Sequence, residues 1–299
     1  KYHFEARSGF SVKKLDYTLE NNVPGLGPLP SVYSESRQDS WLNNISFNYN
    51  MVHDFTVEAS LDADYLDVET TDTVSKTGYD ENRNIFSLFL ALRKGFADRL
   101  NLNLMIRQDW IDFSIVPVTP YFGFDLRLIR DKDLIFKGNI ARNYHYPSLN
   151  DLYWQPGGNP GLKPEQGYSY ELGIEYTLNQ EKHSFSTELT VFRSEIDDWI
   201  IWIPSYRGYW EPNNIKRVLS QGMEFNIDLQ GMFGKVGYRV AGSYAYTSSV
   251  NYGDPLTWGD ESYGKQLVYI PLHSGNLMLN LSYRGFYATY QHNSYSERF

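Results

Sequence analysis

The 299-residue sequence contains no cysteine. Disulfide bonds, thiolate metal sites and cysteine nucleophiles are therefore excluded. Long apolar runs are also missing: the mean hydropathy is −0.48, and no stretch approaches the ~18 consecutive apolar residues of a helical membrane span. Alternating membrane strands remain compatible with this composition, because such strands place apolar residues on one face only.

Positive charge is scarce as well. The chain has 27 Lys and Arg against 36 Asp and Glu, a formal net charge of −9. Since nucleic-acid binding depends on neutralising phosphates, we expect no nucleic-acid partner. Catalytic motifs are equally rare: the sequence has no His-Glu-x-x-His pattern and no Gly-rich phosphate loop between a strand and a helix. We therefore expect that the protein is not an enzyme.

Aromatic residues, in contrast, are abundant, with 25 Tyr, 17 Phe and 7 Trp. Apolar and polar residues alternate with period 2 through most of the chain, as in the run from Leu100 to Ile106, where Asn101 and Asn103 separate the leucines. This pattern predicts β-strands with one apolar and one polar face, and helical periodicity is nearly absent.

The alternation divides the chain into about thirteen expected strands. They lie at residues 2–19, 40–50, 54–66, 84–94, 97–112, 118–129, 133–144, 167–178, 182–194, 216–229, 234–249, 266–284 and 286–297. Every second connection is a tight turn, at 50–54, 94–95, 130–133, 179–182, 231–234 and 284–285. Most of the others are long, aromatic loops. Short turns on one rim and long loops on the other are typical of outer-membrane barrels.

We therefore expect an all-β fold, an antiparallel transmembrane β-barrel of the outer-membrane type. Residues 1–299 are expected to form a single membrane domain. No signal peptide is visible at Lys1, and we expect a truncated chain because Lys1 already begins inside an expected strand. Charged residues expected on its inner face are Glu171, Glu175, Arg193, Glu224, Asp228 and Arg239.

One loop is built to be ordered. The stretch 143–176 joins two expected strands and is punctuated by proline and glycine. Proline fixes φ and removes a backbone donor, and glycine permits positive φ, so this segment cannot continue the ladder of either strand.

This stretch carries a resemblance. Its motifs, from Tyr146 to Tyr153, Gly158 to Glu165 and Glu171 to Tyr176, resemble the barrel signature of TonB-dependent outer-membrane receptors, as do 213–214 and 220–225 further on. The match is specific over about residues 118–290, and the family's plug domain and N-terminal box have no counterpart here. The chain also stops where further strands of the family's roughly 22-stranded barrel would be expected, so the resemblance implies an incomplete barrel that is truncated at both ends. The signature residues are Pro147, Ser148, Leu149, Tyr153, Asn159, Pro160, Leu162, Pro164, Glu165, Glu171 and Gly173.

The resemblance implies a receptor in the outer membrane of a Gram-negative bacterium. Such a receptor binds a scarce nutrient, an iron chelate or cobalamin, in its external loops and imports it with energy from the TonB system. The implied partners are outer-membrane lipid, the small-molecule nutrient complex, TonB through the plug region, and a surface lipoprotein. Two alternatives remain open: a non-energised channel or adhesin barrel, and a soluble carbohydrate-binding β-sandwich.

Loop aromatics are the expected ligand contacts, because they offer large rigid surfaces to flat or apolar ligands. An aromatic girdle at the membrane interface is the competing explanation, and it would include Trp199 and Tyr168. The candidates for ligand contact are Tyr153, Trp154, Trp202, Tyr206, Tyr209, Trp210 and Trp258.

An acidic cluster at Asp62, Asp64 and Asp67 raises the hypothesis of bound calcium, since hard cations take several carboxylate oxygens. The spacing is not that of an EF-hand, because Asp67 stands where glycine is required. Some cobalamin-receptor relatives use loop aspartates for calcium, and a solvated acidic rim explains the same residues. No other cofactor is expected.

Overall fold

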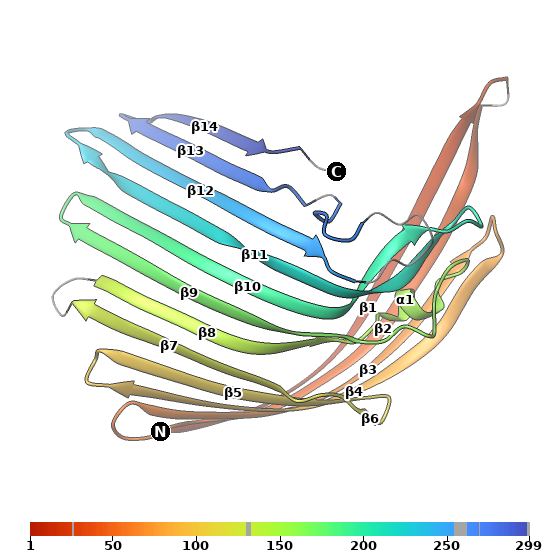
Figure 1. The fold of residues 1–299 in the computed structure, drawn as a ribbon, viewed down its shortest axis with the longest axis horizontal. Helices are drawn as coiled ribbons and strands as arrows, with labels where there is room; N and C mark the ends of the chain where they lie inside the picture. Colours follow the sequence, from red (N-terminus) through yellow and green to blue (C-terminus); the bar gives the residue numbers. More distant parts are fainter. Residues whose placement is uncertain (26, 130–132, 254–261, 269, 298–299) are drawn as a thin grey trace.

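A computed structural model describes residues 1–25, 27–129, 133–253, 262–268 and 270–297, and Figure 1 shows its strands side by side in one curved wall. The fourteen strands form a single antiparallel sheet in which each strand pairs with the next along the chain, except that the short β6 pairs with β5 alone. Within the described residues, β1 pairs with β2 alone and β14 with β13 alone, so the sheet is open.

The strands and the one helix of the described chain have the following bounds. They are β1 (Tyr2–Val23), β2 (Gly27–Asn50), β3 (Phe55–Asp72), β4 (Thr77–Phe96), β5 (Leu100–Ile111), β6 (Ser114–Ile115), β7 (Thr119–Ile129), β8 (Asp133–His145), α1 (Leu149–Tyr153), β9 (Glu165–Gln180), β10 (His183–Pro204), β11 (Trp210–Phe233), β12 (Val236–Asn251), β13 (His273–Tyr283) and β14 (Phe286–Tyr295). In this part of the chain no helix is long and apolar enough to cross a membrane.

The thirteen strands other than β6 correspond one to one with the expected strands, and the expected open, incomplete barrel wall is confirmed. The alternative of a soluble β-sandwich is wrong. A sandwich buries its apolar faces between two packed sheets, whereas all described strands belong to one sheet.

Several expected loops are wrong, because the strands continue through them. β2 begins at Gly27 rather than at residue 40, and β10 and β11 extend over most of the segment between 194 and 216. Water bathes both faces of these extensions, so their residues do not alternate cleanly in polarity. The expected turn at Lys94-Gly95 is also wrong, since β4 runs to Phe96 and the turn occupies the next three residues.

The ladder register assigns each side chain to one of two faces, because directly opposite residues in an antiparallel pair share a face. We call the face that holds α1 the inner face and the opposite one the outer face. On β3 the outer face is apolar from Phe55 to Tyr65, and the β4 residues opposite it include Leu88 and Leu92. The inner face of the same stretch carries Glu58 and other polar residues. This apolar band has the length of a transmembrane strand, roughly 9–11 residues.

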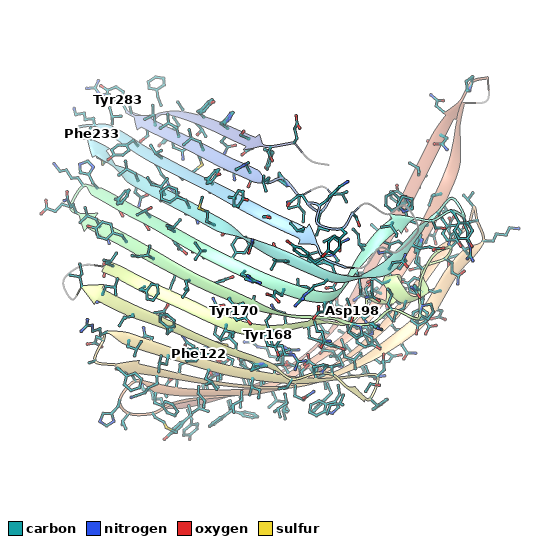
Figure 2. The ribbon with its side chains drawn as sticks, viewed as in Figure 1. Phe122, Tyr168, Tyr170, Asp198, Phe233 and Tyr283 are labelled. Carbon is teal, nitrogen blue, oxygen red and sulfur yellow. The ribbon has the colours of Figure 1, made fainter. Side chains whose placement is uncertain are left out.

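Aromatic side chains mark both ends of the apolar band. Figure 2 places Phe233 and Tyr283 near the tight-turn rim, and Tyr168 part-way along the wall. At the end of the band away from the tight turns, which we call the upper end, the rings of Phe86 and Trp110 are 5.4 Å apart on the outer face. Paired aromatic girdles are the usual boundary of a barrel's lipid-facing surface. The assignment of Tyr168 to such a girdle fits its exposed outer position.

The inner face is polar at the level of the band, and its charges pair with one another. Lys137 lies 3.0 Å from both Glu175 and Glu188, and Arg239 lies 2.7 Å from Asp228. The expected inner-face positions of Glu175, Asp228 and Arg239 are therefore confirmed.

Glu171 accepts a hydrogen bond from Asn139, which is also on the inner face, and the register places Glu224 there as well. The expectation for Arg193 is wrong. Arg193 lies opposite Tyr170 on the outer face and pairs with Glu195 above the apolar band. Its long cationic side chain is tolerated there because water, not lipid, surrounds that height of the strand.

Candidate functional site

The loop between β8 and β9 begins with a capped helical turn. Ser148 is the N-cap of α1, and its hydroxyl accepts a hydrogen bond from the backbone N–H of Asp151 at 3.1 Å. The Asp151 carboxylate in turn accepts from the backbone N–H of Ser148 at 2.9 Å. This reciprocal capping box satisfies two backbone donors that the helix leaves free. Ser148 of the family signature is thus a structural cap.

Arg83 of β4 holds the start of this loop against the inner face. Its side chain is only 7% exposed, and Nη1 donates to the carbonyl of Pro147 at 2.8 Å. The guanidinium also lies over the Tyr146 ring, 4.8 Å from the centroid, and Nε is 3.7 Å from a carboxylate oxygen of Asp112. Nε has no hydrogen-bond partner among the described groups. Arg83 therefore anchors loop backbone 64 residues away in the sequence.

The other side of the loop is bound to the β10–β11 hairpin. Trp202 Nε1 donates to Asp151 Oδ1 at 2.9 Å, and the Asn159 amide donates to the carbonyl of Pro212 at 3.2 Å. Asn214 donates to the Lys163 carbonyl and accepts from the Lys163 backbone N–H, both at 2.9 Å. The loop thus joins β4 to the β10–β11 hairpin across the inner face.

Glu165 fixes the start of β9, and two glycines allow close packing in β9 and in the loop before it. Glu165 Oε1 accepts from the backbone N–H of Ile200 at 2.7 Å. Gly173 lies within β9, where an added Cβ would meet Thr190 and Lys137. At Gly158 an added Cβ would collide with the backbone of Trp154, so only glycine fits this close approach.

The remaining signature residues fill the space between loop and wall. Pro147, Leu149 and Leu162 are buried, and the Tyr153 ring lies 6.4 Å from that of Tyr79 on β4. Pro160 and Pro164 lie in the turns that lead into β9, where their fixed φ suits a chain that has left both ladders. The signature therefore specifies an ordered loop on the inner face. We call this loop, residues 146–164 between β8 and β9, the bracket.

Next to this bracket is a cavity of about 630 Å³ on the inner face. We call it the vestibule cavity. Its lining comes from the upper parts of β1 to β4, above the apolar band, together with α1 and Trp154. Its lining residues are Leu15, Tyr17, Leu19, Val32, Ser34, Ser36, Gln38, Leu66, Val68, Thr70, Tyr79, Arg83, Ser148, Leu149, Asn150 and Trp154.

The apolar part of this lining results from a reversal of the alternation in β1. In the band, Phe10 is on the outer face opposite Trp41, and Val12 lies at the end of the band, opposite Asp39. Beyond the pair Lys13-Lys14 the apolar residues change face, so that Leu15 lies opposite Ser36 on the inner face. The lipid-facing stripe therefore ends here, and an apolar inner stripe begins.

The same reversal occurs in β3. Tyr65 is the last apolar residue of the outer face, and Leu66 and Val68 then line the vestibule cavity from the inner face. Their outer neighbours, Asp67 and Glu69, are charged. The sequence analysis did not predict the cavity, because the strand expected at 54–66 ends at the residue where the inner apolar stripe begins. A shift in the phase of alternation at the same height of two strands is the signal that marks it.

The expected ligand-contacting aromatics are only partly brought together. Trp154 lines the vestibule cavity, and Tyr153 packs beside it against β4. Trp202 and Trp210 were expected in an irregular loop, which is wrong because they belong to β10 and β11. Their side chains stand away from the cavity lining.

Tyr206 and Tyr209 lie at the connection between β10 and β11, where both hydroxyls accept hydrogen bonds from Arg207. Tyr206 is 91% exposed. Trp199, named as a girdle residue, is instead packed against buried Val218, so that assignment is wrong. Trp258 lies outside the described residues. Ligand contact by any of these side chains stays a prediction.

The three aspartates of the calcium hypothesis do not face one another. Asp62 and Asp64 are on the inner face of β3, and Asp67 is on the outer face. Asp62 accepts from the Asn44 amide at 2.6 Å, and Asp64 from the backbone N–H of Asn43 at 3.3 Å. The described residues include no group of three or more His, Asp or Glu side chains placed to hold a metal ion. The register therefore separates Asp67 from Asp62 and Asp64, and calcium binding stays a prediction.

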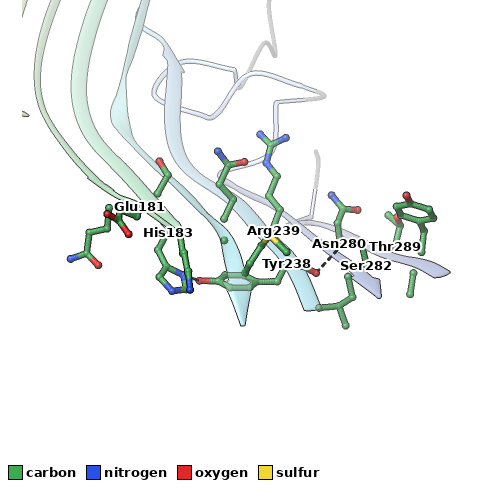
Figure 3. Close-up of a pocket in the computed structure, with 17 residues that line it drawn as sticks. Glu181, His183, Tyr238, Arg239, Asn280, Ser282 and Thr289 are labelled. Atoms are coloured by element: carbon green, nitrogen blue, oxygen red, sulfur yellow. Dashed lines mark hydrogen bonds between the residues drawn. The ribbon is translucent and has the colours of Figure 1, made fainter. Parts of the chain in front are cut away.

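A second hollow lies at the tight-turn rim, near the β14 edge of the sheet. Its volume is about 560 Å³, and Figure 3 shows the Tyr238 hydroxyl directed at the His183 ring. The hydroxyl and His183 Nδ1 are 2.9 Å apart. Polar side chains such as Arg239 and Asn280 form much of its wall. It is at the opposite end of the strands from the bracket, so we regard the vestibule cavity as the better ligand site.

Comparison with known proteins agrees with this architecture. A family model described as "TonB dependent receptor-like, beta-barrel" matches residues 1–299. A vitamin B12 transporter, BtuB of Vibrio vulnificus strain YJ016, is 32% identical over 131 residues, which are 43% of this chain and 19% of that protein. The chain therefore matches only a small share of this relative's length.

Two solved structures share the fold. The copper transporter OprC superposes with a TM-score of 0.70 at 14% identity, over 95% of this chain and 48% of OprC. A mutant of the ferric enterobactin receptor PfeA from Pseudomonas aeruginosa, in complex with enterobactin, gives a TM-score of 0.70 at 16% identity, over 99% of this chain and 47% of the receptor. This chain spans about half of each.

Proposed function

The chain belongs to the TonB-dependent receptor family, and on this premise we propose that it forms part of an outer-membrane receptor that imports a scarce nutrient complex. The barrel wall would sit in the outer membrane of a Gram-negative bacterium. The ligand would bind on the inner face above the band, and the TonB system would supply energy for its passage through the plug region. We assign the wall no catalytic step.

The observation that carries this proposal is the bracket and the cavity beside it. A ligand pocket is usually a concave, mainly apolar space of roughly 300–1,000 Å³ with a few polar groups. The vestibule cavity, at about 630 Å³, has this size and this lining. It lies above the lipid-facing band, where a molecule arriving from outside would first meet the wall.

The membrane setting has separate support. The outer face is apolar over the length of a transmembrane strand, and aromatic residues bound it at both ends. The chain's relatives include a vitamin B12 transporter and receptors for iron complexes. Cobalamin and iron chelates are accordingly the nutrient classes we propose.

Growth and uptake in the native bacterium test the proposal. Deletion of the gene should abolish uptake of one labelled complex, cyanocobalamin or a ferric siderophore, and the full-length gene should restore it. Removal of TonB should abolish the same uptake. Uptake that persists without TonB would favour the non-energised channel, and unchanged uptake of every complex after deletion would refute the proposal.

A further inference from the structure

The described lining of the vestibule cavity offers a ligand many neutral hydrogen-bonding groups but only one charged side chain. Its polar lining residues are neutral: Ser34, Ser36, Gln38, Thr70, Ser148 and Asn150. None of the lining residues is Asp, Glu or Lys, and the one basic residue is Arg83. The chemistry of the cavity therefore depends on whether Arg83 can reach a ligand.

Arg83 is already committed to the protein. Arg83 is 7% exposed and its Nε is enclosed, while Nη1 donates to the Pro147 carbonyl and the guanidinium lies over the ring of Tyr146. A polyanion in the cavity would therefore meet at most part of one cation, and the described lining holds no second Lys or Arg. Burial of its remaining, unpaired negative charges is strongly unfavourable.

The apolar residues of the lining also favour a ligand without net negative charge. Leu15 and Tyr17 are more than half exposed on a face that water would otherwise fill. Large apolar side chains gathered on such a surface mark a contact site. They would be covered by an apolar ligand surface, while the serines and amides beside them would bond to hydroxyl or amide groups.

We propose that the vestibule cavity selects an uncharged ligand, with an apolar body and hydroxyl or amide substituents, over a polyanionic metal chelate. This inference rests on the proposed function and narrows its substrate class. Recognition of a polyanion would need several accessible Lys or Arg side chains, which form charge-assisted hydrogen bonds to anionic oxygens. The described lining has one such side chain, Arg83, and its Nη1 is already bonded to the Pro147 carbonyl.

Binding to the purified full-length receptor tests the inference with two probes: cyanocobalamin, an amide-rich molecule without net charge, and ferric enterobactin, a polyanion. We expect cyanocobalamin to bind the natural protein at least about tenfold more tightly than the polyanion. Val68→Glu, which places a carboxylate in the cavity, should weaken cyanocobalamin binding by about tenfold or more.

Thr71→Glu is the matched control, since Thr71 is exposed on the outer face of the same strand. It should leave binding unchanged, and heat-modifiable gel migration would show that both variants fold. Tighter binding of the polyanion, absence of cyanocobalamin binding, or an equal effect of the two variants would overturn the inference. Uptake of the polyanion that depends on the gene would, in that case, leave the proposed function standing.

Discussion

Replacement of Arg83 by Met should loosen the bracket without unfolding the barrel wall. The substitution removes a hydrogen bond from a charged donor to the Pro147 carbonyl, worth about 1.5–3 kcal/mol. It also removes the cation–π contact with Tyr146, worth about 0.5–2 kcal/mol. Loss of the enclosed, unpartnered Nε returns about 1–3 kcal/mol. At the middle of these ranges, the net cost to the closed bracket is roughly 1.5 kcal/mol, and Met retains most of the apolar volume.

Hydrogen exchange measures this cost directly. The amides of Leu152 and Trp154 donate to the carbonyls of Ser148 and Asn150 within the bracket, at 3.1 and 3.0 Å. A loss of about 1.4 kcal/mol should make these amides exchange roughly tenfold faster if they exchange by local opening. Amides of the β-ladder at the level of the band should keep their protection.

Arg107→Met is the control for this experiment. Arg107 is also on the inner face, but its side chain bonds to Asp109 and Ser87, and within the described residues it makes no hydrogen bond or ion pair with the bracket. It should leave exchange at Leu152 unchanged. Equal exchange in Arg83→Met and the natural protein would refute the anchoring role.

Three further predictions follow from the two faces and the two rims. Leu104→Arg, on the outer face, should block assembly of the barrel because a cation near the bilayer midplane costs roughly 2–4 kcal/mol. Asn103→Arg, on the inner face, should be tolerated, and heat-modifiable gel migration would show whether each variant folds. In the cysteine-free chain, a label at Tyr206→Cys should react on intact cells and one at Glu181→Cys, in a tight turn, should not. Burial alone would raise the pKa of Asp72, but its hydrogen bonds from the β3–β4 turn hold that pKa below the usual range. The ionised Asp72 carboxylate therefore stabilises the β3–β4 turn above the pKa that Asp72 has in the unfolded chain, and this stabilisation is lost as pH falls through the lower folded pKa. Proteolysis of the turn should accordingly become faster in acid, and Asp72→Asn should abolish this pH dependence.

The strand count and the two faces were predictable because strict alternation dictates them. Each lipid-facing strand needs an apolar residue at every second position, as between Leu100 and Ile106. The signature loop was predictable as ordered, because proline and glycine preclude a ladder there. Its partners were not. Arg83 and Trp202 are far away in the sequence, and nothing local in either strand indicates contact with the loop.

Strand ends above the membrane could not be read from the sequence, because alternation there carries no single meaning. Asp197 and Arg217 pair across the β10–β11 ladder although both are charged, so the segment resembles a loop. The face of Arg193 was misjudged for the same reason. A charged residue indicates the inner face only within the lipid-facing band, and above the band it is equally compatible with either face.

Depth measurement at the β1 reversal tests the central claim most directly. Single cysteines can be placed without background, since the chain contains none. Spin labels at Phe10, Lys13 and Tyr17 in the reconstituted full-length protein would then report contact with lipid or with water. The structure predicts contact with lipid at Phe10, which lies opposite Trp41 on the outer face, but access to a water-soluble relaxation reagent at both Lys13 and Tyr17. A lipid signal at Tyr17 would mean that the apolar alternation of residues 15–19 continues the membrane band, and the vestibule wall proposed here would not exist.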